Sequence, residues 1–162
     1  MTDFRALLAA LVEGQVEFIV VGGLAATAHG SARLTLDLDV VYRRTPENLR
    51  RIVSALAPHK PYLRGAPPGL PFQWEETTLQ HGLNFTLTTS LGSIDLLGEI
   101  TGGGRYDDLF PHGCVVTMFS LNCPTLSLQK LIEVKRAAGR PKDLEVIAEL
   151  EAIEEEGGEA AE

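Results

Sequence analysis

Apolar residues recur along the chain with two different spacings, and these spacings predict its secondary structure. Short β-branched or alternating runs, such as VEFIVV at residues 16–21, predict buried or half-buried strands. Longer segments with an apolar face predict helices that pack on a core. Strands are expected at residues 16–21, 36–42, 83–88, 92–97 and 114–119, and helices at residues 3–13, 24–29, 46–57, 127–138 and 141–155.

Capping residues support several of these helix boundaries. Thr45 can cap the third helix, and Pro46 suits its first turn. Gly139 stands where a helix C-terminus favours glycine, and Pro141 stands where the first turn of the next helix accepts proline. The two last helices are therefore expected to form a pair separated by a short turn.

Two segments without periodicity are predicted to be loops. Residues 58–71 contain five prolines and two glycines, and TGGGR at residues 101–105 is expected to be a flexible glycine loop. The strands at 83–88 and 92–97 are joined by a tight turn, which makes them antiparallel and excludes a purely parallel sheet. The predicted fold class is α/β (α+β), a mixed β-sheet flanked by helices, in one domain over residues 1–150.

Two aspartates stand in the predicted strand at residues 36–42. Asp37 and Asp39 are two positions apart, so both side chains project from the same face of that strand. Carboxylates held this close repel each other unless a cation lies between them, and hard oxygen ligands suit Mg²⁺ or Mn²⁺. The alternative interpretation is a solvated strand face near a sheet edge.

A third aspartate, Asp95, lies in the apolar strand GSIDLL. A lone carboxylate buried there without a partner would be costly. If the three aspartates converge, they form a divalent-metal site of the kind that phosphoryl transfer uses.

Gly22 and Gly23 follow the first predicted strand and precede a helix. Backbone N–H groups at that position can bind a phosphate, and glycine allows close approach of the ligand. A simple tight turn is the alternative interpretation of this pair.

The net charge of −8 is concentrated at the C-terminus. Residues 151–162 carry six glutamates and no basic residue, and the rest of the chain holds 14 basic and 16 acidic residues. The tail is expected to fray into solvent. Local basic clusters in the body permit phosphate binding without requiring a nucleic-acid partner.

The apolar runs, histidines and cysteines bear on whether the protein is a membrane, secreted or zinc-binding protein. The apolar runs are too short to cross a bilayer and no secretory signal is evident, so no membrane partner and a cytoplasmic location are expected. The four histidines and two cysteines lack the spacing of a zinc site. Cys114 and Cys123 are expected to be core thiols rather than a disulfide.

The segments GGLAATAHGSARLTLDLDVV, IDLLG and LSLQKLIEVKRAAGRPKDLEVIAEL together resemble the nucleotidyltransferase superfamily with the DNA-polymerase-β-like fold. Within it, they look like small bacterial nucleotidyltransferase-like proteins related to abortive-infection (AbiEii-type) toxins. The resemblance covers residues 16–150 and implies a nucleotidyltransferase-like sheet with a C-terminal helix pair.

The resemblance also implies roles for individual residues. Asp37 and Asp39 would bind the metal ions, and Asp95 would hold the catalytic metal and help to deprotonate the attacking hydroxyl. The nucleotide would be bound by Gly22, Gly23, Arg33, Thr35 and Lys135. Each of the last three has a simpler interpretation: Arg33 can pair with the aspartates, Thr35 can be an ordinary strand residue, and Lys135 can be a solvated helix lysine. Lys142 and Asp143 fall within the same matching segment.

These features together predict a Mg²⁺- or Mn²⁺-dependent nucleotidyltransferase. It would transfer a nucleoside monophosphate from an NTP to an acceptor, either RNA, a protein or a small molecule, and release pyrophosphate. A cognate toxin or antitoxin partner is a further expectation of the resemblance. The alternatives are a catalytically inactive nucleotide-binding or interaction module and a metal-dependent nuclease.

Overall fold

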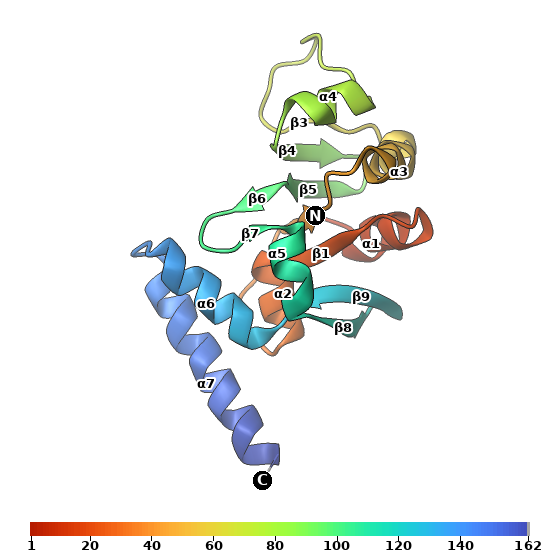
Figure 1. The fold of residues 1–162 in the computed structure, drawn as a ribbon. Helices are drawn as coiled ribbons and strands as arrows, with labels where there is room; N and C mark the ends of the chain where they lie inside the picture. Colours follow the sequence, from red (N-terminus) through yellow and green to blue (C-terminus); the bar gives the residue numbers. More distant parts are fainter. Residues whose placement is uncertain (162) are drawn as a thin grey trace.

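A computed structural model describes the backbone of residues 1–161 and the side chains of residues 1–157. Within them, seven strands form a mixed sheet in the order β3-β4-β5-β2-β1-β9-β8 (Figure 1). The strands are β1 (Phe18–Val21), β2 (Asp37–Tyr42), β3 (Tyr62–Leu63), β4 (Asn84–Thr89), β5 (Gly92–Leu97), β8 (Gly113–Met118) and β9 (Leu121–Leu126). The pairs β2–β5 and β1–β9 are parallel and the others are antiparallel, which confirms the predicted mixed α/β sheet.

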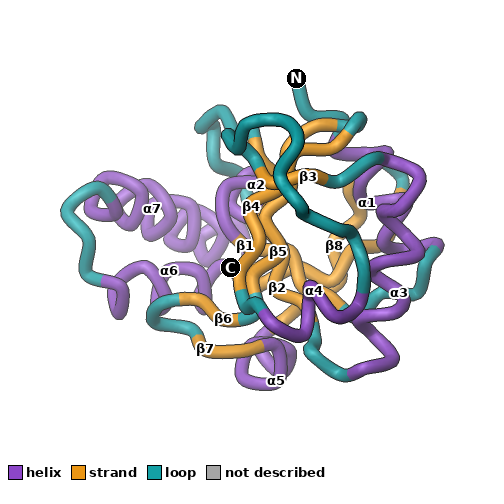
Figure 2. The backbone as a smooth tube through the Cα atoms, turned by 90° about the horizontal axis from the view of Figure 1, so that it is seen from above, coloured by secondary structure: helices purple, strands orange, loops and turns teal. Residues whose placement is uncertain are grey.

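Helices cover both faces of this sheet. They are α1 (Phe4–Glu13), α2 (Gly22–Ala28), α3 (Pro46–Leu56), α4 (Glu76–His81), α5 (Tyr106–Leu109), α6 (Leu128–Ala138) and α7 (Asp143–Ala161), with 3₁₀ turns at Ala57–His59 and Phe110–His112. Helices α1, α3 and α4 lie on one side, and α6 and α7 lie on the other (Figures 1 and 2).

The core forms where the apolar faces of α1 and α3 meet the sheet. Strand alternation places Leu38 and Val40 of β2 on one face, opposite Ile94 and Leu96 of β5, and all four are fully buried. The helices contribute Leu7, Leu8, Leu11, Leu49, Ile52 and Leu56, of which none is more than 2% exposed. The other face of β2 carries Asp37 and Asp39, so core packing on one side fixes the carboxylates on the other.

Most predicted boundaries agree with the structure within one or two residues, and the helix caps are largely confirmed. The Thr45 side chain accepts from the Asn48 N–H, and Gly139 ends α6 with φ +64°. The position of Pro141 was wrong, because α7 begins only at Asp143 and Pro141 lies in the preceding turn. Helix α7 also continues past the predicted end near residue 155 to Ala161; residue 162 lies outside the described residues, and fraying of the acidic tail stays a prediction.

Several elements were not predicted. The proline-rich loop contains β3, and the following segment contains α4. Strand β9 was not predicted, because a proline such as Pro124 is unusual inside a strand. It pairs with β8 along its whole length and with β1 at Val20–Thr125. Cys123 is a buried thiol as expected, whereas Cys114 is exposed because it lies on the edge strand β8; neither forms a disulfide.

The glycine segment at residues 101–105 is not the free loop that was predicted. It turns between β6 (Glu99–Ile100) and β7 (Gly104–Arg105), which pair as a small hairpin. A Cβ at Gly102 would lie 2.6 Å from the Val134 carbonyl oxygen of α6, and the Gly102 φ is +83°. Glycine is required there because the hairpin packs directly on α6.

A buried amide ties the two central strands to α3. The fully buried Asn48 Oδ1 accepts from the Glu17 N–H at 2.7 Å, while Nδ2 donates to the carbonyls of Glu17 at 3.0 Å and Arg43 at 2.8 Å. Asn48→Ala should lower the free energy of unfolding by about 2–4 kcal/mol, because it leaves buried backbone groups unpaired. Urea denaturation measures this change. The exposed Asn122→Ala is the control, and an equal effect of the two substitutions would refute the role of Asn48.

Candidate active site

Three carboxylates meet on one face of the sheet. In the parallel pair β2–β5, Asp39 lies directly opposite Asp95, and Asp37 lies opposite Ser93. Residues opposite each other on neighbouring strands share a face, and the strands are about 4.8 Å apart. The structure therefore brings together Asp37, Asp39 and Asp95, which we call the carboxylate cluster.

The surroundings of Asp39 disfavour its ionised form. Burial raises its pKa to about 7, and hydrogen bonding to and repulsion by Asp95 add to this effect, as does repulsion by Asp37. Its Oδ1 atom is buried and has no hydrogen-bond partner among the described residues. A buried, unpaired carboxylate oxygen is a position where a cation or a proton is needed.

An arginine from outside the predicted site lies against the cluster. Arg64, directly after β3, places Nη2 2.8 Å from Asp95 Oδ1 and Nη1 3.7 Å from Asp37 Oδ2. Arg64 was not predicted as a site residue, because it stands in the proline-rich segment at residues 58–71. The short apolar pair Tyr62-Leu63 just before it was the available signal for a strand that could carry it to the sheet.

Gly22 and Gly23 allow close packing around the cluster. A Cβ at Gly22 would collide with the Asp39 carboxylate, and the φ of Gly22 is +68°; a Cβ at Gly23 would lie 2.7 Å from Thr35 Oγ1. Room for a ligand was the predicted reason for these glycines. The structure gives a second reason, because the start of α2 lies against the side chains of β2 and of the segment before it. Thr35 in turn donates to the Asp37 carbonyl at 3.2 Å.

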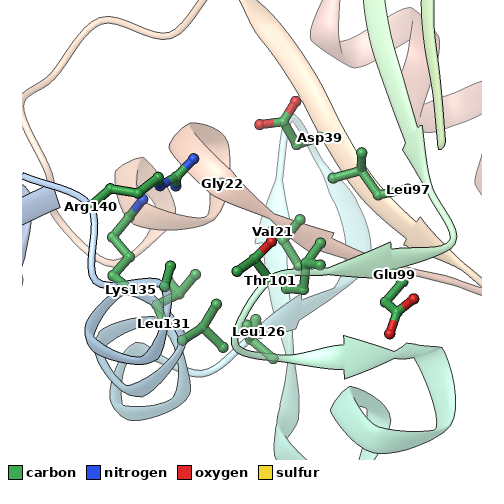
Figure 3. A pocket seen from close by; sticks show the side chains of 13 residues that line it. Val21, Gly22, Asp39, Leu97, Glu99, Thr101, Leu126, Leu131, Lys135 and Arg140 are labelled. Atoms are coloured by element: carbon green, nitrogen blue, oxygen red, sulfur yellow. The ribbon is translucent and has the colours of Figure 1, made fainter. Parts of the chain in front are cut away.

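A pocket of about 320 Å³ opens beside Asp39 (Figure 3). Its apolar lining comes from Val21, Leu97, Ile100, Leu126, Leu131, Val134 and Ala138, and its polar lining includes Gly22, Glu99 and Thr101. Lys135 and Arg140 line the α6 side, and Asp39 lies on the strand side. Concave apolar pockets with a few convergent polar groups are typical of small-molecule sites.

The two cations of the pocket are positioned by one buried carboxylate. Asp143 is 3% exposed and accepts from Arg140 Nε at 2.8 Å, and Lys135 Nζ lies 3.5 Å from its Oδ1. The Arg140 hydrogen bond holds the pKa of Asp143 below its usual value. Arg140 was not assigned to the site from the sequence; its place between Gly139 and Pro141, at the turn between the last two helices, was the available signal.

Arg33 lies away from the carboxylate cluster. In the described part of the chain it pairs with Glu145 at 3.7 Å and Glu149 at 3.5 Å on α7, rather than with Asp37 or Asp39. The structure therefore contradicts the alternative pairing with the aspartates. A role for Arg33 in binding a triphosphate stays a prediction.

The cluster is not arranged as a ready metal site. Among the described residues, no group of three or more His, Cys, Asp or Glu is placed to hold a metal ion as it stands. The donor set nevertheless fits a hard divalent cation, because it consists of carboxylates on adjacent strands and includes the unpaired Asp39 Oδ1. In the structure the Arg64 guanidinium contacts two of the three carboxylates, Asp37 and Asp95.

Comparison with known proteins supports the fold. No protein-family model matches the chain, and no curated protein sequence matches it. Six chains of solved structures match, among them a "putative nucleotidyltransferase" (TM1012) from Thermotoga maritima, with a TM-score of 0.59 and 16% identity over 92% of this chain and 94% of the other. At this identity the likeness shows a nucleotidyltransferase-like fold. Separately, no helix among the described residues has the length and apolarity needed to cross a membrane.

The raised pKa of Asp39 predicts a pH-dependent gain of stability in Asp39→Asn. Because the folded pKa is about 7 and the unfolded value is about 4, the contribution of Asp39 is fully present below pH 4 and is lost as the pH rises through 7. In EDTA at pH 8, Asp39→Asn should be more stable than the wild type by on the order of 1–3 kcal/mol. The gain should shrink towards pH 4.

Urea denaturation across this pH range measures the gain. Asp107→Asn, which removes a carboxylate that is 78% exposed, is the control and should show no comparable rise. A less stable Asp39→Asn protein at pH 8 would contradict the account of Asp39.

Proposed function

We propose that the chain is a metal-dependent nucleotidyltransferase that transfers a nucleoside monophosphate from an NTP to an acceptor. The observation that carries this proposal is the register of β2 and β5, which sets Asp39 against Asp95 beside the pocket. The nucleotidyltransferase-like fold supports it. The acceptor class, RNA, protein or small molecule, and a toxin–antitoxin context are left to experiment.

In this proposal the carboxylate cluster would hold Mg²⁺ or Mn²⁺. The bound cation would neutralise charge on the triphosphate and acidify the attacking hydroxyl. Asp95 would accept the proton of that hydroxyl, whose oxygen forms a bond to the α-phosphorus while the bond to pyrophosphate breaks.

The pocket supplies complementary groups for the donor nucleotide. Lys135 and Arg140 would offset phosphate charge, and Gly22 exposes backbone at the edge of the same pocket. The apolar residues of the sheet and α6 would bury the nucleoside. Protein groups that position charge and exclude water provide most of the catalysis that phosphoryl transfer needs.

One observation favours a second candidate function. Arg64 already neutralises part of the carboxylate cluster, as expected for a nucleotide-binding or interaction module that has no turnover. Such a module would bind a nucleotide through Lys135 and Arg140 without needing a divalent cation. The two candidates therefore differ in the metal dependence of nucleotide binding.

Thermal melting with each NTP, with and without Mg²⁺, tests the proposed function. An NTP at a hundred times its Kd stabilises the folded state by about 2.7 kcal/mol, which corresponds to about 5–10 °C in a domain of this size. We expect this shift with Mg²⁺ and its loss in Asp37→Asn/Asp39→Asn. Pyrophosphate release in the presence of total bacterial RNA or protein then measures turnover.

The outcomes separate the candidates. Asp107→Asn should keep the full shift. A shift that needs no Mg²⁺ and persists in the double variant would support an inactive nucleotide-binding module. No shift with any NTP would contradict the enzyme and favour an interaction module.

A further inference from the structure

We infer that Arg64 is a resident counter-ion of the carboxylate cluster, which a divalent cation must displace before it can bind. Arg64 would thereby set the affinity of the site for metal and keep the metal-free protein folded. This inference rests on the proposed function, since it concerns the same carboxylates. Arg64 would be a further positioning residue of the site. It lies in the proline-rich segment, where the nucleotidyltransferase resemblance placed no site residue.

Several hydrogen bonds hold Arg64 in place, so its contacts differ from those of a simple surface ion pair. Its Nη2 atom donates to Asp95 Oδ1 at 2.8 Å and to the Leu87 carbonyl at 2.7 Å, and it lies 3.4 Å from the Ile94 carbonyl. These acceptors belong to β4 and β5, so the guanidinium is held by backbone as well as by carboxylate. Its side chain is 27% exposed.

The pairing of charges is incomplete. Three carboxylates face one guanidinium, and the Arg64 Nε and Asp39 Oδ1 atoms are both buried without hydrogen-bond partners among the described residues. Arg64 reaches Asp37 and Asp95, but no hydrogen bond or ion pair joins it to Asp39. A divalent cation could serve all three carboxylates and would repel the guanidinium, so the two cations compete for Asp37 and Asp95.

The segment that carries Arg64 is suited to movement. Strand β3 lies at the sheet edge, and only Tyr62 and Leu63 pair with β4. The Arg64 N–H adds one bond to the Thr86 carbonyl at 3.0 Å, and the residues after it run through Gly65 and Gly69, where an added Cβ would meet open space. Withdrawal of the Arg64 side chain would break its hydrogen bonds to the Leu87 and Ile94 carbonyls, but it would leave the pairing of Tyr62 and Leu63 with β4 in place.

Competition makes a reciprocal prediction. If metal binding must release Arg64, removal of the guanidinium should raise the affinity for metal and lower the stability of the metal-free protein. A purely structural arginine would lower stability when removed without improving the affinity for metal. Metal affinity is therefore the decisive measurement.

The experiment titrates Mn²⁺ alone, without nucleotide, into the full chain at pH 7.5 and follows free Mn²⁺ by electron paramagnetic resonance. Arg64→Met should bind Mn²⁺ about tenfold more tightly than the wild type, within the usual range of coupling between two ligands. Its melting temperature without metal should fall, and saturating Mn²⁺ should restore it. Arg64→Lys, which keeps the charge, should stay close to the wild type in Mn²⁺ affinity.

Arg51→Met is the matched control. Arg51 is 32% exposed and pairs with Glu47 at 2.8 Å on α3, away from the cluster, so its loss should leave Mn²⁺ affinity unchanged. Equal or weaker Mn²⁺ binding by Arg64→Met would overturn the inference and leave the proposed function standing. Absence of Mn²⁺ binding in both the wild type and Arg64→Met would overturn the two together.

A second measurement covers the case in which Arg64→Met fails to fold. In the wild type, the Nε–H resonance of Arg64, assigned by its absence in Arg64→Lys, should shift when Mg²⁺ saturates the protein. An unmoved resonance at saturation would overturn the inference, because the guanidinium would then keep its contacts in the metal-bound state.

Discussion

Mutual repulsion among three carboxylates is the constraint on which the site depends. The hydrogen bonds between β2 and β5 fix Asp39 opposite Asp95, and strand periodicity fixes Asp37 on the same face. Leu38 and Val40 are buried on the opposite face, so a shift of register would expose the core. The charges therefore cannot move apart. Only a neighbouring positive charge or a proton can reduce their repulsion. Arg64 supplies such a charge, a proton on Asp39 removes one negative charge, and in the proposed function a divalent cation would supply further positive charge.

The pocket beside the cluster depends on close packing of backbone. Gly22 lets α2 start against Asp39, and Gly102 lets the β6–β7 hairpin lie on α6, where any larger residue would meet neighbouring atoms. These contacts define two walls of the pocket. Asp143 organises the third, because it holds Lys135 and Arg140 at the junction of α6 and α7. Anionic and cationic groups thus face one apolar volume from opposite sides.

The sequence predicted the parts of this arrangement that depend on local periodicity. The strand around Asp37 and Asp39 and the turn-linked strands around Asp95 follow from alternation. The close approach of the three aspartates depends on the pairing of β2 with β5, which local periodicity does not specify. Arg64 and β3 could not be found in this way, because a two-residue edge strand has almost no period and is stabilised by its neighbour β4. Arg33 was assigned by resemblance, but its partners, Glu145 and Glu149, are set by how α7 packs.

The contrast between Asp39 and its neighbours bears on the choice between an enzyme and an inactive module. In a site that needs no metal, substitution would be expected to remove the carboxylate that Arg64 does not pair with, because its burial and its unpaired oxygen only cost stability. This chain instead keeps Asp39 at the centre of the sheet, next to the pocket and to Gly22. A destabilising group beside a concave site is expected where a ligand uses it, and in the proposed function that ligand would be a divalent cation shared by Asp37, Asp39 and Asp95.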